Sequence, residues 1–113
     1  APVRLYYVGW STSTGEADWA LRPLLDSASF PPRLFNTAYY TNDRVDRDIK
    51  QAQLVTDKTE KAKLYRDAQD EAWKDAPWAF LVTERLLSAN NVKLSGVDVM
   101  PDASFAFEEV DLN

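Results

Sequence analysis

Apolar positions recur at helical spacing in the middle of this chain. Val45, Ile49 and Ala52 stand four and three residues apart, which places them on one face of a helix. The helix is predicted to begin near Asp43. Thr41 or Asn42 is suited to cap it, because short polar side chains accept the unpaired N–H groups of a first turn.

A longer helix is predicted to follow Asp57. This residue is placed to cap it, and Glu60 stands three positions further on, at the spacing of a capping box. Lys61 and Lys63 are expected to face solvent, and Pro77 ends the pattern. The apolar stripe comprises Leu64, Tyr65, Ala68, Ala72 and Trp73.

Residues 16–27 predict a shorter helix, which Pro23 should kink or shorten. Its candidate apolar positions are Trp19, Leu21, Leu24 and Leu25.

Strand-like segments flank these helices. Residues 4–10 are β-branched and aromatic, and residues 78–84 form a short apolar run. Residues 97–100 and 105–110 are weaker strand candidates. This order predicts an α+β fold with an α/β-like arrangement. The C-terminal residues carry little regular pattern, as expected of a segment that packs on a surface outside this chain.

The composition excludes some classes of function but does not identify one. The chain has 113 residues, which is enough for one domain with a modest core. The net charge is −5 and Lys and Arg are not clustered, so we expect no nucleic-acid partner. No stretch approaches the roughly 20 apolar residues of a membrane span.

The residue types present also restrict the chemistry. The chain contains no Cys and no His, which excludes thiol nucleophiles, His-assisted triads and Cys/His zinc sites. We also expect no metal and no cofactor. A catalytic site would have to use residues such as Glu16 and Asp18, beside the hydroxyls of the preceding loop. We favour a capping role for Asp18, since it stands just before a predicted helix.

The same region contains the groups that a ligand-binding site requires. The loop from Ser11 to Gly15 supplies hydroxyls and backbone N–H groups next to Trp10, an apolar wall. Glu16 and Asp18 could receive a ligand ammonium, and Arg22 or Arg33 a carboxylate. The residues alone favour binding over hydrolysis only weakly, and both interpretations stay open at this point.

Several short motifs, in a shared order, resemble the C-terminal part of the dipeptide/oligopeptide-binding proteins of ABC importers (solute-binding protein family 5). The resemblance spans nearly the whole chain. Its motifs are Tyr7-Val8-Gly9-Trp10, Glu16-Ala17-Asp18, Asn36 with Tyr40 and Asn42, Val45-Asp46, Leu64-Tyr65-Arg66-Asp67-Ala68-Gln69, Asp75-Ala76-Pro77-Trp78 and the closing residues 107–112.

This resemblance implies a non-catalytic periplasmic protein whose two lobes close around a small peptide and deliver it to permease subunits in the membrane. Full-length members are several times longer. We therefore expect residues 1–113 to be a single domain, a fragment of one lobe, with residues 85–113 crossing back toward the missing lobe. An exposed apolar patch should result, covered in the isolated chain by a homodimer or by strand exchange.

The resemblance also implies a binding site, with one departure. Peptide carriers of this family place an Asp three residues after the Trp that ends the strand, where it pairs with the α-ammonium of the cargo. This chain has Ser13 there. The change argues against ordinary dipeptides and is compatible with glutathione, whose γ-linked glutamate places its ammonium differently; a dipeptide, an oligopeptide or a metal chelate is the alternative. The expected ligand-binding residues are Trp10, Ser11, Thr12, Ser13, Thr14 and Gly15, with Asn36 and Tyr39 from a second loop.

Overall fold

The computed structural model describes residue 5 and residues 7–112. The chain divides into two compact units. Residues 16–80 form a helical unit, and the described residues of 5–15 and 81–112 form the other.

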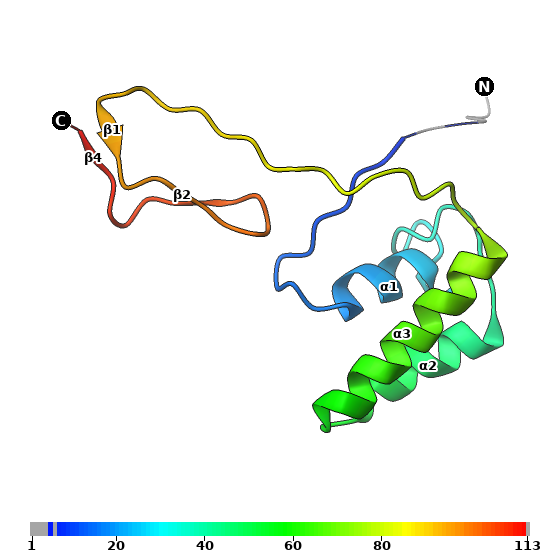
Figure 1. Ribbon diagram of the computed structural model, residues 1–113. Helices are drawn as coiled ribbons and strands as arrows, with labels where there is room; N and C mark the ends of the chain where they lie inside the picture. Colours follow the sequence, from blue (N-terminus) through cyan, green and yellow to red (C-terminus); the bar gives the residue numbers. More distant parts are fainter. Residues whose placement is uncertain (1–4, 6, 113) are drawn as a thin grey trace. The chain divides into compact units, whose positions relative to one another are not determined.

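The helical unit consists of α1 (Asp18–Leu25), a short 3-10 helix (Ser27–Ser29), α2 (Asp43–Leu54) and α3 (Lys58–Asp75). Helices α2 and α3 are joined by a short connection and lie side by side, as Figure 1 shows. Helix α1 contacts both of them.

Local capping groups set the bounds of the two longer helices. The side chain of Asn42 accepts hydrogen bonds from the backbone N–H groups of Arg44 and Val45, at 2.9 and 3.3 Å. Asp57 accepts one from Glu60 N–H at 2.8 Å. Asn42, one of the two candidates, therefore caps α2, and the predicted cap Asp57 is confirmed for α3. Helix α3 ends at Asp75, just before Pro77, as the sequence predicts.

The core of this unit is formed by one face of each helix. Its buried residues are Leu21, Leu24, Leu25, Val45, Ile49, Ala52, Tyr65, Ala68 and Ala72. The predicted stripe on α2 is confirmed, since its members are fully buried. The prediction for Trp73 is wrong: its side chain is 66% exposed and its ring stacks on Phe80, with 5.4 Å between the centroids. Ala72 is buried, and one residue of helical rotation turns Trp73 away from that face.

Helix α1 is shorter than predicted at both ends. It starts at Asp18 rather than at residue 16 and ends at Leu25, with Pro23 inside it. Proline has no N–H to donate to the preceding turn, which weakens the helix at this point. After Leu25 the chain passes through Asp26 into the 3-10 helix, which begins at Ser27.

The other unit contains short strands. β1 (Leu94–Ser95) pairs with β4 (Asp111–Leu112), and β2 (Asp98–Val99) pairs with β3 (Phe105–Ala106), both antiparallel. The structure is thus mixed α+β. The two later strand predictions are confirmed only as two-residue strands.

The two earlier strand predictions are wrong within the described residues. Residues 5, 7–10 and 78–84 form no strand, while residues 4 and 6 lie outside the described part of the chain. A strand is stable only when its N–H and C=O groups are paired with a neighbour, and these segments find no such neighbour in the described chain.

The described residues of the unit that contains residues 81–112 form no buried core. None of its described residues is buried, and large apolar side chains such as Leu87 and Val92 are almost fully exposed. Apolar side chains of this unit are therefore exposed, while the expected apolar patch stays a prediction. Among the described residues, no helix is long and apolar enough to cross a membrane.

Candidate functional site

The predicted ligand-binding residues fall into two groups, one in each unit. Residues 10–15 belong to the unit that contains residues 81–112, and Asn36 and Tyr39 belong to the helical unit.

The first group is an open loop that leads toward helix α1. Most of its residues are exposed, and Thr12 is half-buried. The hydroxyl of Ser11 donates a hydrogen bond to the backbone carbonyl of Asp102 at 3.2 Å. Gly15 adopts a left-handed backbone conformation, with φ of 71°, which glycine accepts without steric cost. A ligand role for this loop stays a prediction.

Asn36 organises the second group rather than presenting an exposed amide. Its side chain is fully buried. The amide nitrogen donates to the carbonyl oxygens of Asp26 and Tyr40, at 3.0 and 2.9 Å, and the amide oxygen accepts from Tyr40 N–H at 3.0 Å. These bonds close the loop from Asn36 to Tyr40. The ligand contact of Asn36 stays a prediction. In this structure its amide group forms hydrogen bonds with the backbone of Asp26 and Tyr40.

Tyr39 projects from the same loop. It has a left-handed backbone conformation, with φ of 52°, and its side chain is 62% exposed. Its ring packs at an angle against Phe30, with 5.2 Å between the centroids. An exposed aromatic face on a closed loop is suited to contact a ligand.

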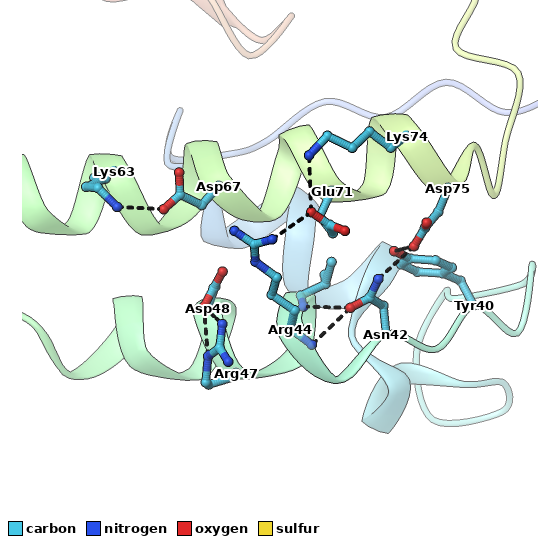
Figure 2. A network of polar contacts seen from close by, with 11 residues as sticks. Tyr40, Asn42, Arg44, Arg47, Asp48, Lys63, Asp67, Glu71, Lys74 and Asp75 are labelled. Carbon is cyan, nitrogen blue, oxygen red and sulfur yellow. Dashed lines mark hydrogen bonds and ion pairs between the residues drawn. The ribbon is translucent and has the colours of Figure 1, made fainter.

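A carboxylate at the end of α3 anchors the residues that follow Tyr39. The Tyr40 hydroxyl donates to Oδ2 of Asp75 at 2.6 Å, and Asn42 Nδ2 donates to the same oxygen at 2.7 Å (Figure 2). These hydrogen bonds lower the pKa of Asp75. Burial and the hydrogen bond to Asp75 raise the pKa of Tyr40.

Asp75 belongs to one of the family motifs, but its contacts with Tyr40 and Asn42 were not predicted from the sequence. One signal was present: a carboxylate in the last turn of a helix faces the negative end of the helix dipole, which is unfavourable unless donors compensate it.

Asp18 does not cap α1, which corrects the prediction. The N-cap position is Ala17, and no side chain caps it. Asp18 instead accepts hydrogen bonds from Arg22 Nε at 2.9 Å, Gln53 Nε2 at 2.9 Å and the Tyr65 hydroxyl at 3.3 Å. Both carboxylate oxygens are thus used: Oδ2 bonds Arg22 within α1, and Oδ1 bonds residues of the other two helices. This disfavours Asp18 as an acid–base catalyst.

Two open hollows on the described surface lie elsewhere. One, of about 460 Å³, follows α2, and the other, of about 660 Å³, follows α3. Neither is lined by any of the predicted ligand-binding residues. Within residues 5 and 7–112, no group of three or more acidic side chains is arranged to hold a metal ion.

Sequence comparison relates the chain to binding proteins rather than to enzymes. No family model matches it. Glutathione-binding protein GsiB of Pectobacterium atrosepticum is 62% identical over 110 residues, which cover 97% of this chain and 21% of the relative. The proteins of the same name from Escherichia coli (strain K12) and Salmonella typhimurium are 53% and 52% identical, again over 97% of this chain and over 22% of each relative.

The chain is therefore homologous to part of the glutathione-binding proteins, which confirms the resemblance inferred from its motifs. It spans about a fifth of the length of these curated relatives. The relatives are named for binding, in agreement with the interpretation of the chain as non-enzymatic.

Proposed function

We propose that this chain is part of a periplasmic solute-binding protein that captures glutathione and delivers it to the permease of an ABC importer. The observation that carries the proposal is the identity of 52% to 62%, over 97% of the chain, to proteins named for glutathione binding. The match covers both the loop at residues 10–15 and the loop that carries Tyr39.

We propose ligand contacts for the residues of each loop. Trp10 is an apolar wall, and residues 11–15 donate hydrogen bonds to the carboxylates and amides of the peptide. Tyr39 adds an aromatic contact. Asn36 shapes its loop from within, as its buried hydrogen bonds indicate.

The proposal includes a two-lobed parent protein, in which residues 85–113 cross back toward the other lobe. The exposed apolar side chains of residues 81–112 and the absence of a buried residue among the described part of that unit support this arrangement. A homodimer of the isolated chain would cover the same apolar side chains. Sedimentation of the 113-residue chain distinguishes a monomer from such a dimer.

The test of the function is calorimetric titration of a full-length protein that contains this sequence. Glutathione and the α-linked isomer Glu-Cys-Gly are titrated separately. Binding of glutathione alone, at micromolar affinity or better, supports the proposal. A preference for the α-linked peptide would keep peptide capture but reject glutathione, and no binding of either would reject both. The 113-residue chain alone should bind weakly, since the other lobe contributes much of such a pocket.

A further inference from the structure

We propose that Asp75 is a positioning residue for ligand binding, because its carboxylate holds the loop that presents Tyr39. The inference rests on the proposed function for the part that concerns the ligand. The part that concerns the loop rests on geometry alone.

The loop is closed from within by Asn36, which bonds the carbonyl and the N–H of Tyr40. Tyr39 lies inside this closed segment, and its N–H donates to the carbonyl of Asn36 at 3.1 Å. The left-handed backbone of Tyr39 is unusual for a bulky residue and persists only where its surroundings hold it. The direction of the Tyr39 ring therefore depends on how firmly Tyr40 is fixed.

Asp75 supplies that attachment from a different element. Figure 2 shows the Tyr40 hydroxyl and the Asn42 amide converging on the Asp75 carboxylate at the end of α3. Both bonds are short and have an ionised acceptor, the stronger class of hydrogen bond. The loop is thus joined to the C-terminal end of α3 immediately after Tyr39.

A second carboxylate on α3 forms salt bridges instead of contacting the loop. Glu71, one turn earlier on α3, pairs with Arg44 at 3.2 Å and with Lys74 at 3.3 Å. Asp75 instead accepts from two uncharged donors, Tyr40 and Asn42. Its side chain is exposed and lies outside the core cluster, so its removal should loosen the loop and leave the helices packed.

The test compares glutathione affinities in the full-length protein. We expect Asp75→Ala to weaken binding by about five- to tenfold, the size of one ordinary hydrogen bond, because Asp75 acts on the ligand only through the loop. Asp75→Asn should recover most of the affinity, because an amide oxygen still accepts from Tyr40. Asp70→Ala, at an exposed acid on the same helix, is the matched control and should change nothing. An unchanged affinity for Asp75→Ala would overturn the proposal.

A double-mutant cycle separates positioning from general destabilisation. If Asp75 acts through Tyr39, Asp75→Ala should add no further loss of affinity in a Tyr39→Ala background. Fully additive losses would overturn the proposal. Tyr40→Phe is the second variant, should Asp75→Ala fail to fold; it removes one of the two bonds and should weaken binding less than Asp75→Ala.

Hydrogen exchange keeps the test independent of the ligand. The peptide that covers residues 36–41 should exchange about tenfold faster in Asp75→Ala, since local opening exposes the Tyr40 amide. Faster exchange in a protein that binds no glutathione would support Asp75 as the loop anchor and reject only the proposed function. Unchanged exchange would reject the anchor itself.

Discussion

The hydroxyl of Tyr65 on α3 donates a hydrogen bond to Oδ1 of Asp18 on α1, with 3.3 Å between the two oxygens. The same oxygen accepts a hydrogen bond from Gln53 on α2, so one carboxylate joins the three helices. Tyr65 is also a core residue. A polar junction is therefore built into the edge of an apolar core.

This junction predicts a loss of stability at alkaline pH. Burial, together with the charge of Asp18, raises the pKa of Tyr65 from 10.0 to about 12. The folded state favours the neutral phenol, so the contribution to stability is complete below pH 10 and is lost as the pH rises toward about 12. In Tyr65→Phe this part of the alkaline loss should disappear, as urea unfolding across that range would measure. An equally steep decline in Tyr65→Phe would contradict the prediction.

The core predicts a large effect at Ile49. Its side chain is fully buried on α2, so Ile49→Ala should lower the free energy of unfolding by about 2–5 kcal/mol. Leu54→Ala on the same helix is the control, because that side chain is 82% exposed and should change stability by less than about 0.5 kcal/mol. Urea unfolding of both variants measures the difference. Similar losses in the two would show that α2 does not pack as described.

Gly96 is predicted to be essential for the pairing of β1 with β4. It has φ of 75°, and a Cβ at this position would collide with the carbonyl oxygen of Glu109. We expect Gly96→Ala to abolish the interstrand nuclear Overhauser effects between Leu94 and Leu112. Gly9→Ala, where the space is open, should leave them intact. Persistence of these signals in Gly96→Ala would contradict the described strand pairing.

Ser13 is predicted to set the cargo preference of the full-length protein. A carboxylate there would offer a partner to the α-ammonium of an ordinary peptide. Ser13→Asp should therefore shift the preference toward the α-linked peptide by about tenfold or more. Ser13→Asn is the uncharged control of similar shape. Calorimetry with both peptides measures the shift, and an unchanged preference for glutathione in Ser13→Asp would count against a role for Ser13 in selecting cargo.

Local signals in the sequence were sufficient for much of the helical unit. The start of α2 near Asp43, the cap of α3 at Asp57 and the end of α3 before Pro77 were all predicted, and the cap of α2 was narrowed to Thr41 or Asn42. A cap or a proline acts within one helical turn, so its effect is readable from neighbouring residues. The buried face of α2 was predicted for a similar reason, because its apolar spacing repeats along the chain.

Strands were less predictable from residue type. The aromatic residues before Trp10 and the apolar run after Pro77 have strand-like composition, yet neither forms a strand among the described residues. Strand propensity expresses how well a side chain fits a paired and half-buried surface. Where the described chain provides no neighbouring strand, strand-like composition alone cannot produce the hydrogen bonds of a β-sheet.

By itself, the sequence determined where α2 and α3 begin, where α3 ends, the apolar face of α2 and the relation to glutathione-binding proteins. Only the tertiary structure decided that Asp18 joins three helices, that Asn36 is buried within its loop, and that Asp75 anchors the residues after Tyr39. The physical reason is distance along the chain. Caps and periodicity act between near neighbours, whereas a hydrogen bond from Tyr40 to Asp75 exists only once the helices have packed and brought the two side chains together.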